Sequence, residues 1–379
     1  MTGFPRHARA LEALEARGRR RALHPRAGHD FASNDYLGLA GSELLRAAAR
    51  AALDRGVPVG AGGSRLLRGN ADEHERLETE AAAFFGAGRA LFMGGGFQAN
   101  MAIFSALPLQ GDLVLHDALI HASAHDGMRL GRAETCPFPH NDVTAAEAAI
   151  RTWRANGGAG QVWIAVESVY SMDGDFAPVA DLMALADRED AVLVVDEAHA
   201  TGLWGSAGRG LSHDFADRPN LLTLHTCGKA LGVSGALICG DAALIDTLVN
   251  KARAFIYATA PSPLNAALVR AALTEIALDN PLRNRALGRV KTAHDLAARL
   301  CGLTGLQSQI LPVVLGDDKR ALAVAAALQD RGYDIRAIRP PTVPRGTARL
   351  RISITLNVSS DTIEAMIRDL AQVLETVPA

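Results

Sequence analysis

Cysteine is scarce in this sequence. Only four cysteines occur, Cys136, Cys227, Cys239 and Cys301, and no two of them form a C-x-x-C pair. Neither a disulfide framework nor a zinc knuckle is therefore indicated. A reducing cytoplasm is the expected compartment, since disulfides persist mainly in oxidising environments.

An excess of one charge is also missing. Lys and Arg total 39, whereas Asp and Glu total 41, so the formal net charge is −2. Without a basic surplus to neutralise a phosphate backbone, nucleic acid is not an expected partner.

Long uninterrupted apolar runs are absent as well. Residues 1–25 alternate charged side chains with Leu and Ala, which is unlike a signal peptide. The most apolar long stretch, residues 91–109, contains three consecutive glycines together with Gln98 and Asn100. A membrane span needs about 20 predominantly apolar residues. The expectation is a soluble protein without a membrane partner.

The 379 residues and 49% hydrophobic content are enough for two or three domains with a sizeable core. Helical spacing of apolar residues predicts a helix over 72–85, ended by Gly86. A short apolar run over 90–93, a glycine loop over 94–96 and a helix over 97–106 follow. This order predicts a strand, a loop and a helix.

Three further apolar runs read as buried strands: 162–168, 191–195 and 221–226, with a helix opening near Pro178. Continuously apolar strands separated by helices are typical of a parallel sheet covered on both faces. The predicted fold class is therefore α/β. In such folds the functional residues gather at the carboxyl ends of the strands.

The C-terminal part predicts a smaller α+β unit. Strands are expected over 310–315 and 348–355, and helices over 319–331 and from Asp361 onward. Ala-rich helices over 266–277 and 285–300 form a plausible hinge region. The expected organisation is an N-terminal arm over 1–40, a large α/β domain over 41–270 and a small α+β domain over 271–379.

The letters DEAH at residues 196–199 suggest a nucleotide-driven motor such as a helicase. That site requires an upstream G-x-x-x-x-G-K-[ST] loop, and none occurs. The single Gly-Lys pair, Gly228 and Lys229, lies downstream and is followed by Ala230. The helicase interpretation is not favoured.

Asp196 and Lys229 offer a different interpretation, because each follows a predicted strand and both would lie at one sheet edge. A carboxylate beside a pyridine nitrogen and a lysine able to form a Schiff base are the requirements of pyridoxal phosphate chemistry. The glycine loop before Phe97 could bind its phosphate at a helix N-terminus. Taken singly, these residues also fit a loop lysine, a capping carboxylate and a tight turn.

Asp117, His121 and His125 are spaced four residues apart. On a helix they would share a face and could resemble metal ligands. No further ligand set is apparent, so no metal is expected. An imidazole such as His121 could equally lie flat on a cofactor ring, and a surface or core position remains the ordinary alternative for any one histidine.

Together the motifs resemble, in order and spacing, the α-oxoamine synthase family of pyridoxal phosphate enzymes, over nearly the whole chain. The segments are FASNDYLGL ending at Leu39, GAGGSRLLRG ending at Gly69, LFMGGGFQAN ending at Asn100, VESVYSMDGDFAP ending at Pro178, DEAHATG ending at Gly202 and TCGKALG ending at Gly232. The resemblance implies the aspartate aminotransferase type fold, known as fold type I. Gly95 departs from the family, whose members usually have Ser there.

The resemblance also implies roles for single residues. Lys229 would carry the cofactor, Asp196 would pair with its ring nitrogen, His199 would contact its phenolic oxygen and His121 would stack on the ring. The remaining cofactor contacts implied are Gly96, Phe97, Ser171, Thr226 and, from the partner subunit of a homodimer, Thr259. Implied substrate contacts are Arg21, Asn34, His121, Thr342 and Arg351.

Within the family, residues 139–144 and 337–355 are most similar to the members that act in biotin biosynthesis. This implies a decarboxylative condensation of L-alanine with a pimeloyl thioester of coenzyme A or acyl carrier protein. A glycine-using sister activity, such as that of 2-amino-3-ketobutyrate ligase or 5-aminolevulinate synthase, is the alternative. A catalytically silent cofactor-binding relative is less favoured because Lys229, Asp196, His121 and His199 are all present.

Overall fold

A computed structural model describes residues 3–278 and 281–378 of the chain. The protein divides into two compact units. The larger unit comprises residues 37–171 and 176–284, and the smaller unit comprises residues 1–36, 172–175 and 285–379. The domain boundaries expected after residues 40 and 270 stay a prediction.

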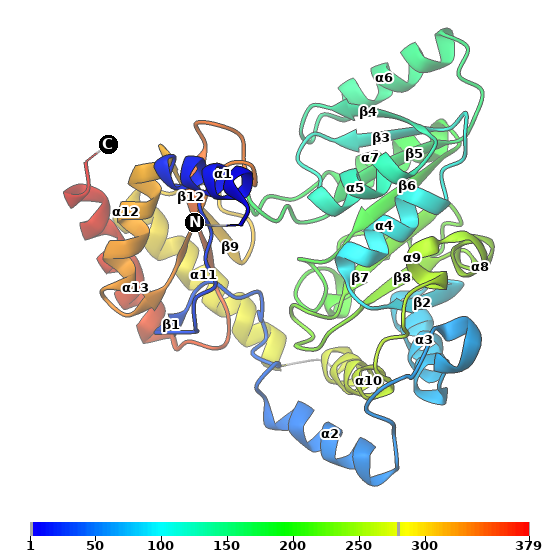
Figure 1. The fold of residues 1–379 in the computed structure, drawn as a ribbon, viewed down its shortest axis with the longest axis horizontal. Helices are drawn as coiled ribbons and strands as arrows, with labels where there is room; N and C mark the ends of the chain where they lie inside the picture. The colour runs from blue at the N-terminus through cyan, green and yellow to red at the C-terminus, as the bar shows by residue number, and fades with distance from the viewer. Residues whose placement is uncertain (1–2, 279–280, 379) are drawn as a thin grey trace. The chain divides into compact units, whose positions relative to one another are not determined.

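The larger unit is built on a seven-stranded sheet with the strand order β2-β8-β7-β6-β5-β3-β4 (Figure 1). Its strands are β2 (Arg89–Met93), β3 (Leu113–Asp117), β4 (Glu134–Phe138), β5 (Val162–Glu167), β6 (Ala191–Asp196), β7 (Leu221–Thr226) and β8 (Ala236–Gly240). Strand β8 pairs antiparallel with β2 and β7, and the pairs from β7 to β4 are parallel. The mostly parallel sheet predicted from the sequence is confirmed.

Helices cover both faces of this sheet (Figure 1). On one face, α4 (Gly96–Ala106), α5 (Ala122–Leu130), α8 (Ala242–Lys251) and α9 (Arg253–Ile256) share an apolar core with the strands. On the other face, α6 (Val143–Ala155) and α7 (Val179–Arg188) do the same. The remaining elements are α2 (Glu43–Asp54), η1 (Arg65–Gly69), α3 (Asp72–Phe85), η2 (Ser206–Gly208), η3 (His213–Phe215) and α10 (Pro263–Ala277).

The central strands are mostly apolar because both of their faces are buried. All six residues of β5 and of β7 are buried, for example. Each large apolar side chain removed from water in this way contributes about 1.5–3 kcal/mol. Helix α3 ends where the sequence predicts, since Gly86 adopts a left-handed conformation with φ of 76°. Sheet and helix ends together fix the positions of the loops that follow the strands.

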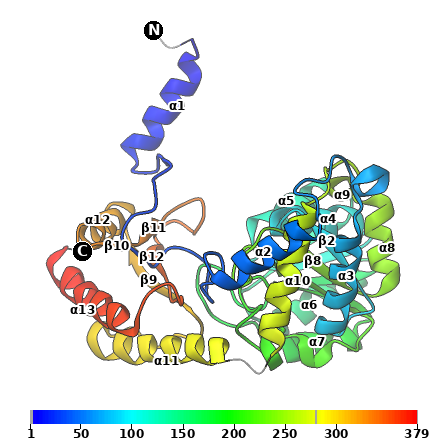
Figure 2. The same cartoon turned by 90° about the horizontal axis from the view of Figure 1, so that it is seen from below.

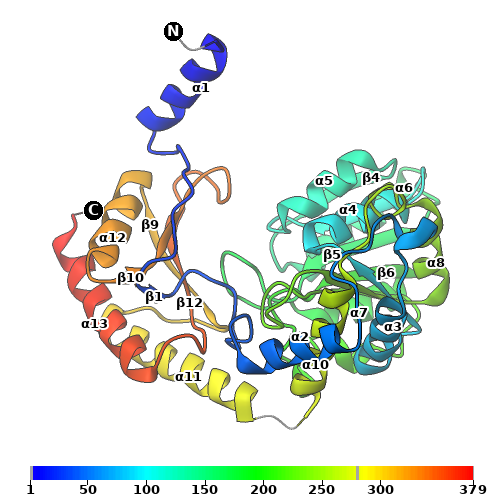
Figure 3. The same cartoon turned by 60° about the horizontal axis from the view of Figure 1, so that its bottom comes forward.

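Within its described residues, the smaller unit contains two sheets and four helices (Figure 3). Its strands are β1 (His29–Asp30), β9 (Ile310–Gly316), β10 (Tyr333–Asp334), β11 (Arg336–Ile338) and β12 (Ala348–Ser353). The order β11-β12-β9 is antiparallel, and β1 pairs with β10 in parallel. Helices α11 (Pro281–Cys301), α12 (Asp318–Gln329) and α13 (Ser360–Thr376) pack on this α+β core. The strands and helices predicted over 310–379 are confirmed within a few residues.

Helix α1 (Pro5–Ala16) is the least integrated element of the smaller unit. It contributes no buried residue, and it stands away from the rest of its unit in Figures 2 and 3. Leu11 and Leu14 on this helix are 46% and 39% exposed. Packing against its own unit therefore does not account for the position of α1.

The four cysteines are free thiols that fall into two classes. Cys227 and Cys239 are buried in the larger unit, and burial raises the pKa of both thiols. Cys136 and Cys301 are partly exposed, in the larger and the smaller unit respectively.

No helix within residues 3–278 or 281–378 combines the length and the apolar character needed to cross a bilayer.

Candidate functional site

Polar side chains gather at one edge of the large sheet, where the parallel strands end. Asp117, Glu167, Asp196 and Thr226 are the last residues of β3, β5, β6 and β7. All four are buried, with exposed fractions of 9% or less. Because parallel strands end on the same side of a sheet, their carboxyl ends form a single site.

The glycine loop supplies one wall of this site. Helix α4 begins at Gly96, directly after β2 and the glycine run, so its first N–H groups lack partners within the helix. A Cβ atom at Gly96 would lie 3.5 Å from Oγ1 of Thr226. Phe97, the next residue, is 50% exposed. The structure thus brings Gly96 and Thr226 together, as an anion site at a helix N-terminus requires.

Asp196 is held by two donors. Nδ2 of Asn100 lies 2.8 Å from Oδ2 of Asp196, and the backbone N–H of Ala198 donates to Oδ1 over 3.0 Å. Asn100 lies on α4 and is 3% exposed. A buried carboxylate with two hydrogen bonds is well suited to face a cationic group.

Lys229 and His199 lie side by side. Nζ of Lys229 is 2.6 Å from Nε2 of His199. His199 follows β6 and is 3% exposed, whereas Lys229 follows β7 and is partly exposed. The lysine predicted to react and the histidine predicted to contact the cofactor therefore share one hydrogen bond.

His121 is the N-cap residue of α5. Its Nδ1 atom lies 2.7 Å from Oγ of Ser123 and accepts a hydrogen bond from the Ser123 N–H over 3.2 Å. Burial lowers the pKa of His121, an effect that Asp196 opposes and Lys229 reinforces. Asp196 and Lys229 both influence the pKa of His121, so the three residues lie in the same site.

The helical spacing considered for Asp117, His121 and His125 is wrong as a shared helix face. Asp117 is the last residue of β3, and α5 begins only at Ala122. The Asp117 carboxylate instead accepts hydrogen bonds from His140 and from the N–H groups of Leu119 and Asn141. It ties the loop after β3 to the loop after β4. No group of three or more His, Cys, Asp or Glu side chains is arranged to hold a metal within the described residues.

Ser171 lies in the loop after β5, and its N–H donates to Oε2 of Glu167 over 3.0 Å. Burial and, next, the Asp196 charge raise the pKa of Glu167 to about 8. Among the residues that the structure describes, Oε1 of Glu167 has no hydrogen-bond partner. This buried acid is a site residue that the sequence analysis did not single out.

Apart from His121, the expected substrate contacts lie in the smaller unit and form two groups. In the first, Nη2 of Arg351 lies 3.4 Å from Oη of Tyr36, which donates to Oδ1 of Asn34 over 3.1 Å. In the second, Nη2 of Arg21 donates to Oγ1 of Thr342 over 3.0 Å. Asn34 and Arg351 are thus neighbours, as are Arg21 and Thr342.

The remaining expected contact, Thr259, is exposed and lies between α9 and α10. The residues missed by sequence reasoning are Asn100, Ser123 and Glu167. Asn100 and Glu167 carried a usable signal, because each is a polar residue in an apolar stretch predicted to be buried. Ser123 carried none, since its importance depends on how α4 and α5 pack.

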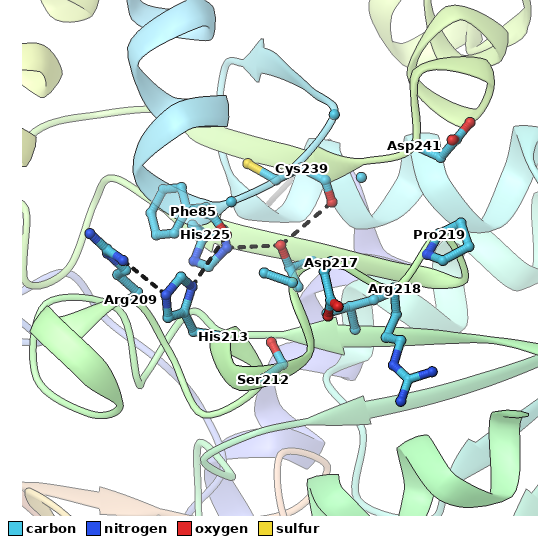
Figure 4. Close-up of a pocket in the computed structure, with 17 residues that line it drawn as sticks. Phe85, Arg209, Ser212, His213, Asp217, Arg218, Pro219, His225, Cys239 and Asp241 are labelled. Carbon is cyan, nitrogen blue, oxygen red and sulfur yellow. Dashed lines mark hydrogen bonds between the residues drawn. The ribbon is translucent and has the colours of Figure 1, made fainter.

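A cavity of about 220 Å³ lies in the larger unit, along one face of β7 (Figure 4). Thr223, His225 and Cys239 line it, and no expected cofactor contact among the described residues does. His225 stacks on Phe85 with ring centroids 3.6 Å apart, and burial lowers its pKa to about 3. A neutral, packed histidine of this kind is a structural feature of the sheet.

Comparison with known proteins now identifies the family. Residues 28–370 match the model for aminotransferase class I and II. The chain belongs to this family. It is also 39% identical to the 8-amino-7-oxononanoate synthase of Anaeromyxobacter dehalogenans (strain 2CP-1), with 97% of this chain and 95% of that protein covered.

Solved structures agree with this family. A serine palmitoyltransferase with pyridoxal phosphate has a TM-score of 0.84 at 27% identity, covering 92% of this chain and 87% of the other. The 8-amino-7-oxononanoate synthase of Francisella tularensis has a TM-score of 0.76 at 27% identity, covering 92% and 98%. The fold type I architecture and the resemblance to α-oxoamine synthases are confirmed.

Pyridoxal phosphate is the cofactor of this family. The residues present fit it. The first turn of α4 beside Thr226 suits a phosphate, the buried Asp196 suits a ring nitrogen that must stay protonated, and Lys229 supplies an amine. The assignment of each contact to the cofactor remains a prediction.

Proposed function

We propose that this chain condenses L-alanine with a pimeloyl thioester to give 8-amino-7-oxononanoate, as in biotin biosynthesis. The observation that carries the proposal is the pairing of Lys229 with His199 beside Asp196 at one sheet edge. The named relatives support the substrate pair. In the balanced reaction a carbon–carbon bond forms between alanine Cα and the thioester carbonyl, the thiol leaves, CO2 is lost and one proton is taken up.

Bound pyridoxal phosphate supplies an electron sink for the bonds broken at alanine Cα. Asp196 would face the ring nitrogen, held in place by the hydrogen bonds from Asn100 and Ala198. Lys229 would hold the cofactor, and its Nζ would be the general base that takes the Cα proton of alanine. His199 would contact the phenolic oxygen, with Ser171 also near the ring, and Gly96, Phe97 and Thr226 would hold the phosphate.

The smaller unit would bind the substrates. Arg351 is 7% exposed and adjoins Tyr36 and Asn34, an arrangement that suits the carboxylate of alanine. Arg21 and Thr342 would contact the acyl substrate. His121 would donate a hydrogen bond to a carboxylate or carbonyl oxygen of the reacting molecule.

We also propose a cytoplasmic homodimer whose active site lies at the subunit interface. Exposed Thr259 would reach the cofactor phosphate of the partner subunit. The four free thiols support a reducing compartment. Sedimentation that finds a fully active monomer would refute the shared site.

The test is competition between amino acids and acyl donors. Purified protein is incubated with alanine, glycine or serine and with pimeloyl, succinyl or acetyl thioesters of coenzyme A and acyl carrier protein, and products are identified by mass spectrometry. The highest kcat/KM is expected for alanine with a pimeloyl donor. A higher value for glycine with acetyl or succinyl donors would identify a sister activity, and no turnover with any pair would favour a silent cofactor-binding protein.

A further inference from the structure

Asn100 connects two residues that are expected to contact the cofactor ring, Asp196 at the ring nitrogen and His121 on the ring face. Its side-chain amide lies 2.8 Å from Oδ2 of Asp196 and 3.0 Å from Oγ of Ser123. Ser123, which is fully buried, lies 2.7 Å from Nδ1 of His121. The result is a continuous buried chain from Asp196 through Asn100 and Ser123 to His121.

Close packing of two helices produces this chain. Gly127 of α5 approaches α4 so closely that a Cβ atom there would lie 2.8 Å from the carbonyl oxygen of Asn100. Ser123 lies one turn before Gly127 on the same face of α5. The small residue at position 127 therefore lets Ser123 reach Asn100.

The chemistry of each group fixes the direction of every hydrogen bond. An ionised Asp196 carboxylate can only accept, so Asn100 must turn Nδ2 toward it. The second Nδ2 proton then points to Oγ of Ser123, whose own proton is left to donate to Nδ1 of His121. Because the Ser123 N–H also donates to Nδ1, that nitrogen accepts twice and bears no proton. Burial lowers the pKa of His121, which favours the neutral ring.

We propose that Asn100 is a positioning residue that holds Asp196 in place and, through Ser123, fixes His121 as the tautomer with its proton on Nε2. His121 then presents an N–H donor, and it acts on the reacting oxygen by hydrogen bonding and not as a base. The consequence for the cofactor and substrate depends on the site proposed above. The tautomer itself depends only on the contacts within the larger unit.

The tautomer is tested directly by nitrogen NMR of protein labelled with 15N-histidine, with and without cofactor. His121→Gln identifies the His121 signals by their loss. The expected spectrum has a protonated Nε2 and an unprotonated Nδ1 in wild type, and a mixture of tautomers in Ser123→Ala. A proton on Nδ1 in wild type overturns the proposal. This measurement requires no turnover, so it is independent of the proposed substrates.

The positioning role is tested with Asn100→Ala and Ser123→Ala, using cofactor affinity and steady-state kinetics. Asn100→Ala is expected to raise the cofactor Kd and lower kcat by about tenfold or more each, since Asp196 loses a charge-assisted hydrogen bond. Ser123→Ala should lower kcat by about tenfold with a cofactor Kd within about twofold of wild type.

The matched control is Ser105→Ala on the same helix, because within the described part of the chain the Ser105 hydroxyl donates to the backbone carbonyl of Met101 and to no site residue. It should leave kcat and cofactor Kd unchanged. If Asn100→Ala and Ser123→Ala lower the melting temperature but leave kcat and Kd like the control, Asn100 is merely a satisfied buried amide and the proposal is wrong.

Discussion

Nζ of Lys229 and Nε2 of His199 are 2.6 Å apart, although the two residues follow different strands, β7 and β6. Only three other lysines occur in the chain, Lys251, Lys291 and Lys319, and all are exposed. The reactive amine is thereby singled out.

Borohydride reduction of the holoenzyme should attach the pyridoxyl group to Lys229, because this is the lysine at the carboxyl edge of the sheet. Peptide mass analysis locates the adduct. Lys229→Ala should abolish it and lower kcat by several powers of ten, each worth about 1.4 kcal/mol of barrier. Lys251→Ala serves as the control and should keep both adduct and activity. An adduct on any other lysine contradicts the assignment.

Asp196→Asn should leave the cofactor bound while lowering turnover by several powers of ten, since a neutral amide no longer favours a protonated ring nitrogen. Exchange of the alanine Cα proton with deuterated solvent measures the affected step without the acyl donor. Asp246→Asn, at an exposed carboxylate of α8, is the matched control. Near-normal exchange in Asp196→Asn would refute the role given to this carboxylate.

Arg351→Lys should raise the KM for alanine by about tenfold with a smaller change in kcat, because lysine cannot reproduce a bidentate contact with a carboxylate. Arg336, its register partner on β11, is more exposed and pairs with Asp334. Arg336→Lys therefore makes the same chemical change away from the expected contact. Equal KM values for the two variants would show that Arg351 does not hold alanine.

Glu197→Ala should destabilise the protein by about 3 kcal/mol, and Glu197→Gln by about 2 kcal/mol. The fully buried carboxylate accepts hydrogen bonds from Ser168, from the backbone of Leu211, and from both the backbone and side chain of Ser212. Each carboxylate oxygen accepts a hydrogen bond from a backbone N–H. The side-chain amide of Gln has a single oxygen, so it can accept only one of these two hydrogen bonds. Urea unfolding of the cofactor-free protein measures the loss. An unchanged midpoint in Glu197→Ala would contradict this.

His225 should make the protein sensitive to acid. Its pKa is lowered to about 3 in the folded protein, so only the unfolded chain takes up its proton between about pH 6.5 and 3. Stability is therefore lost as the pH falls through this range, by about 2 kcal/mol between pH 7 and 5. Urea unfolding at the two pH values should give a loss smaller by that amount in His225→Leu. The same loss in both proteins would contradict a buried neutral His225.

Sequence reasoning placed Asp196 and Lys229 at one edge of the sheet because the signal is local. Each follows a mostly apolar strand, and parallel strands direct their carboxyl ends to one side. The hydrogen-bonded chain through Asn100 and Ser123 could not be predicted from the sequence, because it depends on how closely α5 approaches α4 at Gly127. Close approach between helices is a long-range property, and spacing along the chain does not encode it.

Short elements were missed for a related reason. Strand β10 has two residues and β11 has three, too few to establish a period of two. Their pairing comes from β1, about 300 residues away, and from β12. The helix face predicted for Asp117 and His121 is wrong because β3 extends to Asp117. At this position the carboxylate accepts hydrogen bonds from backbone N–H groups of two loops.

The distribution of the four thiols gives the protein a built-in pair of labelling sites. Cys227 and Cys239 are buried in the larger unit, and burial raises the pKa of both thiols. They should therefore resist alkylation, because the thiolate is the reactive form. Cys136 and Cys301 are partly exposed, and one belongs to each unit. A donor and an acceptor dye attached at these two positions would report the distance between the units by energy transfer during turnover, without any engineered cysteine.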